Sequence, residues 1–163
     1  MEVRSIEIIV RALNAAKVQY LIVGGLAVNA HGFVRLTRGV DIVLGLECEN
    51  AARGLDALMQ AGWRLAIPEK AEAFADEATR ARWRTEKNMI VLKLWSDEHR
   101  RTPVDIFIYE PFDFAAEYSR ADRLEVCPGV LAPVVMLETL LEMKRAAGRR
   151  QDLTDIEELQ RAR

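Results

Sequence analysis

Five residues in the first quarter of the chain have the types and spacing of a site for a phosphate-bearing ligand. They are Gly24, Gly25, Arg35, Thr37 and Asp41. Paired glycines let the backbone turn tightly, and the first N–H groups of a helix that follows attract anions. An arginine fork and a threonine hydroxyl bind phosphate oxygens, whereas a carboxylate binds a metal ion. The ordered combination therefore predicts a nucleotide-handling site.

The position two residues before Asp41 is Gly39, which has no side chain. Alternate residues of a strand share a face, so a carboxylate at position 39 would point the same way as Asp41. We find no convincing substitute for it. Glu47 lies six residues beyond Asp41, roughly 20 Å along an extended strand, and Asp97 and Glu98 fall in a predicted loop. The site is one acid short of a carboxylate pair on this strand.

The apolar pattern predicts the elements that position these residues. Residues 20–23 are expected to form a buried strand, followed by a short helix and a second strand over 39–46. The further predicted elements are an opening helix from Val3 through Leu13, a helix capped by Asn50 and running to Gln60 with Leu55, Leu58 and Met59 inward, a short strand over 63–67, a solvated helix or flap over 69–84, a hairpin of 88–95 and 104–109, a short strand over 124–127, a helix from Pro133 to about 147, and a last helix over 151–162.

This arrangement resembles the nucleotidyltransferase (polymerase-β-like) superfamily, and most closely the small bacterial group of AbiEii-type toxins and lincosamide nucleotidyltransferase-like proteins. That group typically has Gly-Gly or Gly-Ser, a short helix, then Arg-x-Thr-x-Asp-hydrophobic-Asp, with a third acid on a later strand. The matching positions are Gly24, Gly25, Arg35, Thr37, Asp41 as the second acid and Asp105 as the candidate third acid, with Gly39 in place of the first.

The resemblance implies an α/β (α+β) nucleotidyltransferase fold, a curved mixed β-sheet flanked by helices, with C-terminal helices. It also implies a role for each acid. Asp41 would be a metal ligand and Asp105 a metal ligand or general base, holding one or two Mg²⁺ ions with a nucleoside triphosphate. Mg²⁺ needs only one or two carboxylates when phosphates and water complete its shell. We therefore expect nucleotide binding to survive the absence of an acid at Gly39 better than turnover does.

The C-terminal region resembles the signature Leu-x-x-x-Lys followed by Gly-Arg-x-x-Asp-hydrophobic-x-Asp in the same group, and Asp155 stands at its last position. Lys144, Arg149 and Asp152 match it and would contact the nucleotide. A solvated lysine is the alternative for Lys144, and capping of the last helix is an equally good alternative for Asp152.

Three other polar residues are less favoured as members of the site. We expect His31, at the end of the short helix, to serve in packing or a turn, and His99 to be solvated in a polar loop. Lys93 precedes that loop on the strand expected to run antiparallel to the strand of Asp105, and it could face the site. Sequence does not give its register.

Composition fits one domain over residues 1–163, with a helical portion from about 133 to 163. The formal net charge of −2 gives no overall basic character that would indicate nucleic-acid binding. Cys48 and Cys127 have no metal-type spacing, which favours a reducing, cytoplasmic location. No apolar run is long enough to span a membrane, so no membrane partner is expected.

The first functional hypothesis is a Mg²⁺-dependent transfer of a nucleotide from a nucleoside triphosphate to an RNA, protein or small-molecule acceptor. Such a protein could be the toxin of a toxin–antitoxin pair, with a cognate antitoxin as partner. The second hypothesis is a degenerate module that binds nucleotide or a partner without transfer, because Gly39 replaces a metal-ligand aspartate. A third is that Gly39 was introduced to silence a toxic enzyme. The sequence does not separate these three.

Overall fold

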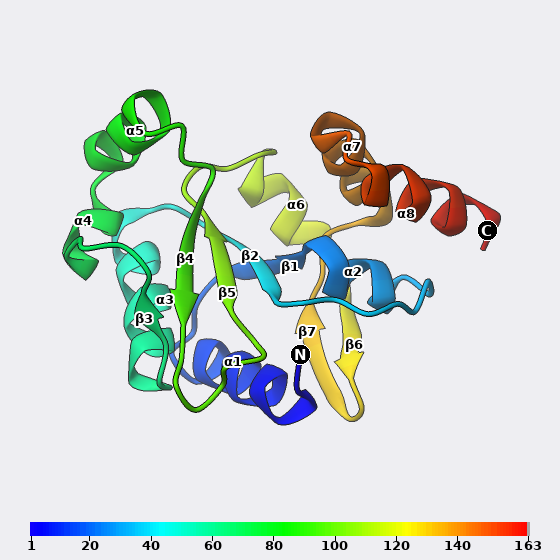
Figure 1. The fold of residues 1–163 in the computed structure, drawn as a ribbon, viewed down its shortest axis with the longest axis horizontal. Coiled ribbons are helices and arrows are strands. Elements are labelled where there is room, and N and C mark those ends of the chain that lie inside the picture. The colour runs from blue at the N-terminus through cyan, green and yellow to red at the C-terminus, as the bar shows by residue number, and fades with distance from the viewer. Residues whose placement is uncertain (163) are drawn as a thin grey trace.

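A computed structural model of the protein describes residues 1–162. The fold is a mixed α/β arrangement of helices around a five-stranded sheet (Figure 1). Arg163, the last residue of the expected helical portion, lies outside the described residues. The helices are α1 (Val3–Ala15), α2 (Gly24–Ala30), α3 (Cys48–Gln60), α4 (Ala71–Ala75), α5 (Glu77–Glu86), α6 (Phe114–Arg120), α7 (Leu137–Ala147) and α8 (Arg150–Arg161). The strands are β1 (Tyr20–Val23), β2 (Val40–Leu44), β3 (Arg64–Leu65), β4 (Val91–Trp95), β5 (Val104–Phe107), β6 (Arg123–Cys127) and β7 (Val130–Pro133).

The sheet has the strand order β1-β2-β5-β4-β3. Only the central pair β2 and β5 is parallel, and the other three pairs are antiparallel. The parallel pairing requires a long crossover, and the chain between β2 and β5 supplies it with α3, α4, α5 and the β3–β4 hairpin. The N-terminal halves of β2 and β5 are thereby brought side by side at the centre of the sheet.

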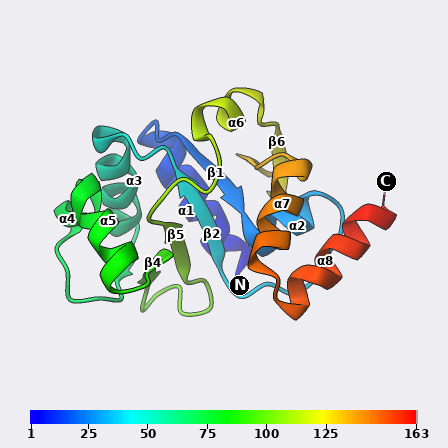
Figure 2. The same ribbon diagram turned by 90° about the horizontal axis from the view of Figure 1, so that it is seen from above.

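One face of the sheet packs into the main core. Leu92 and Leu94 of β4 and Ile106 of β5 are buried on that face, whereas Lys93 and Asp105 between them project from the other. The apolar stripe of α1 adds buried side chains to the same core, namely Ile6, Ile9, Val10 and Leu13. Figure 2, seen from above, places α5 and α7 on opposite sides of β2 and β5.

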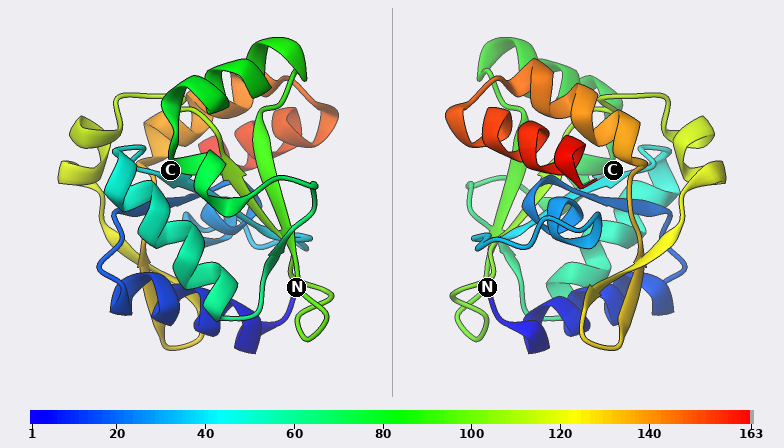
Figure 3. Two further views of the ribbon diagram at one scale, coloured as in Figure 1. Left: turned by 90° about the vertical axis from the view of Figure 1, so that its left-hand side faces the viewer. Right: turned by 90° about the vertical axis from the view of Figure 1, so that its right-hand side faces the viewer.

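A two-stranded sheet of β6 and β7 connects the central sheet to the last two helices. An isolated parallel bridge joins Val134, just after β7, to Ile22 of β1, and the Val135 N–H donates to the Ile22 carbonyl over 3.1 Å. Helices α7 and α8 pack side by side, as the right-hand view of Figure 3 shows in orange and red. Gly148 ends α7 with a φ of 61° in the left-handed region that favours glycine. The C-terminal helical pair is thus anchored beside β1.

Several sequence-based boundaries were wrong, and each error has a local cause. Helix α3 begins at Cys48 and is capped by Glu47, because the Asn50 side chain instead bonds the backbone of Gln19 and Gly45. Met59 is 38% exposed rather than inward. The segment expected as one solvated helix or flap forms α4 and α5, whose buried members are Phe74, Arg80 and Trp83.

Further along the chain, α6 was not predicted. Pro133 ends strand β7 instead of starting a helix, and α7 begins only at Leu137. The four helical residues expected before Leu137 are taken by the β6–β7 hairpin and the bridge to β1. Among the described residues, no helix is both long enough and apolar enough to cross a membrane.

Candidate functional site

Asp41 and Asp105 are direct partners across the parallel pair β2 and β5. Residues directly opposite on neighbouring strands share a face, and adjacent strands are about 4.8 Å apart. Both side chains are half-buried. The two carboxylates predicted from widely separated motifs therefore stand next to each other at the centre of the sheet.

The Gly24-Gly25 turn packs directly against Asp41. Gly24 has a φ of 64°, and a Cβ at this position would collide with the Asp41 carboxylate. A Cβ on Gly25 would collide with the Thr37 hydroxyl. The Gly25 N–H is hydrogen-bonded to Asp41. The turn is thus fitted to a carboxylate of the protein itself, and both glycines are needed for that close approach.

Burial raises the pKa of both acids and so favours their protonated forms. Burial raises the pKa of Asp41 from 3.8 to about 6, the nearby Asp105 charge adds to the shift, and the Gly25 N–H, Lys144 and Arg149 oppose it. Burial also raises the pKa of Asp105, against the lowering effect of Lys93. Two close, desolvated carboxylates repel each other when both are ionised, and a cation between them would relieve that repulsion.

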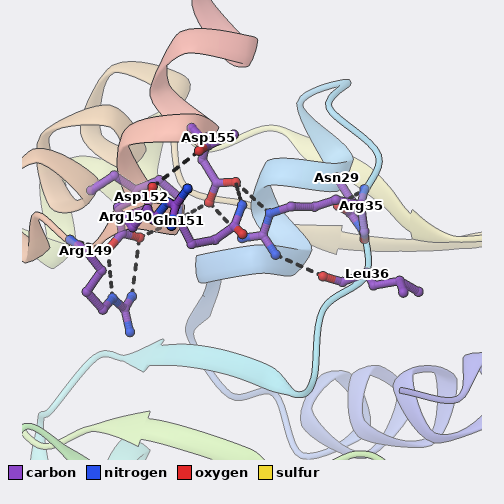
Figure 4. A network of polar contacts seen from close by, with 10 residues as sticks. Asn29, Arg35, Leu36, Arg149, Arg150, Gln151, Asp152 and Asp155 are labelled. Atoms are coloured by element: carbon purple, nitrogen blue, oxygen red, sulfur yellow. Dashed lines mark hydrogen bonds and ion pairs between the residues drawn. The ribbon is translucent and has the colours of Figure 1, made fainter.

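Arg35 does not point freely into the site but holds the C-terminal helix. Its Nε lies 2.6 Å from Asp155 Oδ1 and its second nitrogen 2.7 Å from Oδ2, a two-pronged contact with a fully buried carboxylate (Figure 4). Asn29 fixes the backbone of Arg35, accepting from its N–H and donating to its carbonyl. Arg35 therefore clamps the loop between α2 and β2 onto α8.

Lys144 is a buried member of the same network rather than a solvated lysine. Its ammonium lies 3.0 Å from Asp152 Oδ1 and 2.7 Å from Asp155 Oδ2. Arg149 binds Asp152 from the other side, Nε to Oδ2 over 2.7 Å, and its backbone N–H also donates to Asp152. Capping of the last helix by Asp152, the alternative to a nucleotide contact, is confirmed. Five charged residues thus join the site loop, α7 and α8.

Asp155 closes the C-terminal signature, but the sequence analysis gave it no role at the site. It follows Asp152 by three residues, which places both on one face of α8, and it receives both Arg35 and Lys144. Burial alone would raise its pKa, but hydrogen bonds from Arg35, Lys144 and Gln151 together lower it. The available signal was the last acid of the signature, three residues after Asp152.

Gly39 lies where a side chain would meet the backbone of the β4–β5 loop. A Cβ there would be 2.7 Å from the Pro103 carbonyl oxygen and 3.1 Å from its Cγ. That carbonyl already accepts from the Val40 N–H over 3.0 Å. The Thr37 hydroxyl donates to the Gly39 carbonyl over 3.5 Å and lies beside Gly25.

The histidines and the spare acids lie apart from the carboxylate pair. His31 caps α2 and its Nε2 contacts the Val135 carbonyl at 2.8 Å, as expected of a packing residue. The expectation that His99 is solvated is wrong: it is 8% exposed and stacks on Trp63 with ring centroids 4.3 Å apart. Asp97 and Glu98 line a surface hollow beside the end of α3, so they do not replace the missing acid.

A second surface hollow lies at the other end of β5. Arg84 of α5 stacks over the Tyr109 ring at 3.6 Å, and Arg80 and Glu110 also line this hollow. Tyr109 is four residues beyond Asp105, roughly 13 Å along an extended chain. The hollow therefore does not include the carboxylate pair.

The donor atoms suit Mg²⁺ only in company with a ligand. Within residues 1–162, no group of three or more His, Cys, Asp or Glu side chains is arranged to hold a metal ion. Asp41 and Asp105 supply two carboxylates, and Mg²⁺ is commonly held by one or two carboxylates together with substrate phosphates and water. The pair fits a magnesium ion that arrives with a nucleotide.

In the comparison with known proteins, no protein-family model and no curated protein matches this chain.

Proposed function

We propose that this protein binds a nucleoside triphosphate with Mg²⁺ and transfers the nucleoside monophosphate to a hydroxyl or phosphate acceptor. The observation that carries the proposal is the direct pairing of Asp41 with Asp105 beneath the Gly24-Gly25 turn. Metal-dependent transfer of this kind consists mostly of positioning and charge neutralisation. The two adjacent carboxylates would hold a metal ion that neutralises phosphate charge. The backbone turn beside them would help to position the ligand.

The proposal gives each residue near the pair a separate task. Asp41 and Asp105 would hold Mg²⁺, which supplies charge neutralisation at the phosphates when it is bound. Asp105, which pairs with Lys93 on the neighbouring strand, would accept the proton of the attacking hydroxyl. The acceptor oxygen bonds to the α-phosphorus while the bond to pyrophosphate breaks. Arg35, Lys144 and Asp152 keep the surrounding loop and helices in place, because Arg35 and Lys144 both bind Asp155 and Lys144 also binds Asp152.

A nucleotide-binding protein without transfer activity is the second candidate, and Gly39 favours it. A carboxylate at position 39, immediately before β2, would add a second acid beside Asp41, but the Pro103 carbonyl oxygen lies 2.7 Å from where its Cβ would be. The chain is thus shaped around the absence of that acid. Binding needs only the Asp41–Asp105 pair and the ligand's phosphates. Transfer would lack the third carboxylate, so the absence of that acid affects transfer more than binding.

The acceptor class distinguishes biological roles within the first candidate. An RNA or protein acceptor would fit a toxin held in check by an antitoxin, and a small-molecule acceptor would fit a modifying enzyme. The net charge of −2 favours none of these acceptors. Identifying the labelled product is therefore part of the test.

The experiment compares the wild-type protein with Asp105→Asn and Gly39→Asp. Each is incubated with Mg²⁺, labelled nucleoside triphosphates, and cellular RNA and protein, with label transfer and nucleotide binding followed together. Transfer by the wild type that Asp105→Asn abolishes would support the enzyme. Binding without transfer in the wild type would support the second candidate. Absence of both in the wild type would contradict the proposal.

The Gly39→Asp variant needs its own control because its side chain meets Pro103. Pro103→Gly combined with Gly39→Asp gives the loop backbone room to move, and circular dichroism shows whether each variant is folded. Transfer gained by a folded variant over an inactive wild type would show that one missing ligand had silenced the scaffold.

A further inference from the structure

Three charged residues form a row across three neighbouring strands. Asp41 of β2 pairs with Asp105 of β5, and Asp105 pairs with Lys93 of β4. Residues opposite one another on adjacent strands project from the same face and lie close enough for their side chains to meet. The register that sequence could not give thus places a lysine beside the carboxylate pair, in the order acid, acid, base.

Lys93 projects from the face of the sheet that carries Asp41 and Asp105. Its neighbours Leu92 and Leu94 are buried in the core on the opposite face, whereas Lys93 itself is exposed. Because side chains alternate along a strand, Lys93 cannot turn toward the core without a shift of register that would expose both leucines. Its ammonium is therefore held on the face that carries Asp41 and Asp105.

Lys93 also differs from the other basic residues near the site. Arg35, Lys144 and Arg149 each contact a buried aspartate of α8 at hydrogen-bonding distance. Within the part of the chain that the structure describes, Lys93 has no carboxylate within 4.0 Å and makes no hydrogen bond through its side chain. Of these four cations, it alone makes no direct ion pair or hydrogen bond, although its charge lowers the pKa of Asp105.

We propose that the Lys93 ammonium binds phosphate oxygens of the nucleotide on the Asp105 side of the site. This inference rests on the proposed nucleotide-binding function and names a residue that the sequence resemblance does not include. A triphosphate brings several negative charges beside two carboxylates, and with Gly39 no third acid is present to attract a further divalent ion. A lysine supplies a compact positive charge on a flexible stem with three donors, which suits phosphate oxygens.

A second reading of the row is that Lys93 serves only Asp105, by electrostatic attraction between neighbours. The two readings predict opposite effects of removing the charge. If Lys93 binds phosphate, Lys93→Met weakens the binding of a Mg²⁺–polyphosphate ligand. If it serves only Asp105, its removal leaves the two carboxylates without a competing cation, so Mg²⁺-dependent binding stays equal or becomes tighter.

The test measures binding of inorganic tripolyphosphate and of the four nucleoside triphosphates by titration calorimetry in the presence of Mg²⁺. The variants are Lys93→Met, Lys93→Arg and Arg64→Met. Arg64 pairs with Trp95 at the edge of the same face, and its removal deletes one positive charge without touching the row. Unfolding midpoints of all variants show whether the sheet is intact.

We expect Lys93→Met to weaken tripolyphosphate and nucleotide binding alike by about tenfold to a hundredfold, the usual effect of losing a charge-assisted hydrogen bond. Lys93→Arg should recover most of the affinity, and Arg64→Met should match the wild type within about twofold. Unchanged or tighter binding by folded Lys93→Met, in a wild type whose binding is lost in Asp105→Asn, would overturn this inference alone. No binding of any probe by the wild type would overturn it together with the proposed function.

Discussion

The Pro103 carbonyl oxygen lies 2.7 Å from where a Cβ on Gly39 would be, so the β4–β5 loop occupies the space of a side chain at that position. The same carbonyl accepts the hydrogen bond from Val40 that begins β2. The absence of an acid at Gly39 is thus part of how β2 and β5 meet. A substitution there disturbs the strand pairing that brings Asp41 beside Asp105.

Gly39→Ala should destabilise the protein. Replacing glycine by alanine at an unstrained position usually adds about 0.4–1 kcal/mol of stability through the unfolded chain. Here the added methyl group meets backbone rather than a flexible side chain, and overpacking of that kind costs about 1–3 kcal/mol. Urea denaturation should therefore give a net loss of roughly 1–2 kcal/mol.

Arg38→Ala is the matched control for this substitution, since Arg38 precedes Gly39 and is exposed. It should change the free energy of unfolding by less than about 0.5 kcal/mol. A Gly39→Ala protein as stable as the wild type would mean that the loop yields to the new side chain. In that case Pro103 would not explain the absence of an acid.

Asp41→Asn should stabilise the protein at neutral pH while it removes ligand binding. The pKa of Asp41 in the folded protein is about 6, above its ordinary value of 3.8, because the carboxyl is buried and lies near Asp105. The folded state therefore binds this proton more tightly than the unfolded state does. Stability from this group is greatest below about pH 4 and declines as the pH rises to 6.

The asparagine variant lacks that decline. At pH 7 it should exceed the wild type by up to about 2–3 kcal/mol in the free energy of unfolding, and near pH 4 the two should agree. Thermal or urea unfolding across pH 4–8 measures the difference. A difference that does not grow between pH 4 and pH 7 would show that Asp41 is ionised at its ordinary pKa.

Asp155→Ala should be strongly destabilising, because it leaves the buried Lys144 and the arginine fork of Arg35 with less negative charge. Removing one partner of a buried ion pair costs about 3–5 kcal/mol. Lys144 keeps Asp152 at 3.0 Å, so we expect a loss near the lower end, about 3 kcal/mol. Chemical denaturation measures it, with Glu158→Ala as the control on the same helix.

Glu158 pairs with Arg161 at the surface of α8, and breaking that pair should cost about 0–1 kcal/mol.

The ion pairs of Asp155 with Arg35 and Lys144 also predict that the protein loses stability in acid. Because the pKa of Asp155 is lowered in the folded protein, its contribution is present at neutral pH and is lost as the pH falls through the lowered pKa, below 3.8. Equal losses for the Asp155 and Glu158 variants would contradict a supporting role for the network.

Local sequence patterns predicted most of the fold near the site. The strand over 20–23, the helix that begins at the glycine pair and the second strand, expected over 39–46 and observed over 40–44, follow from short apolar runs broken by glycine. The pairing of β6 with β7 and the helix α6 were missed. Their residues are only partly buried and show little periodicity, and β7 is fixed by contacts with β1 across more than a hundred residues.

The sequence likewise predicted some features of the candidate site and not others. The sequence suggested that Asp41 and Asp105 belong together, and the register of β2 with β5 makes them neighbours. It could not show that Arg35 is bound to Asp155, because that contact joins residues 120 positions apart. Nor could it place Lys93, whose position depends on the register of β4 with β5. Long-range pairing, rather than residue type, decides which charges are free.

The most direct test of the central claim is titration of the wild-type protein and of Asp105→Asn with a nucleoside triphosphate, with and without Mg²⁺. Asp97→Asn serves as the control, because Asp97 lies in the β4–β5 loop away from the pair. We predict Mg²⁺-dependent binding by the wild type and the control, and at least a tenfold loss in Asp105→Asn. Equal affinities for the wild type and Asp105→Asn, or binding that does not depend on Mg²⁺, would contradict a metal–nucleotide site at Asp41 and Asp105.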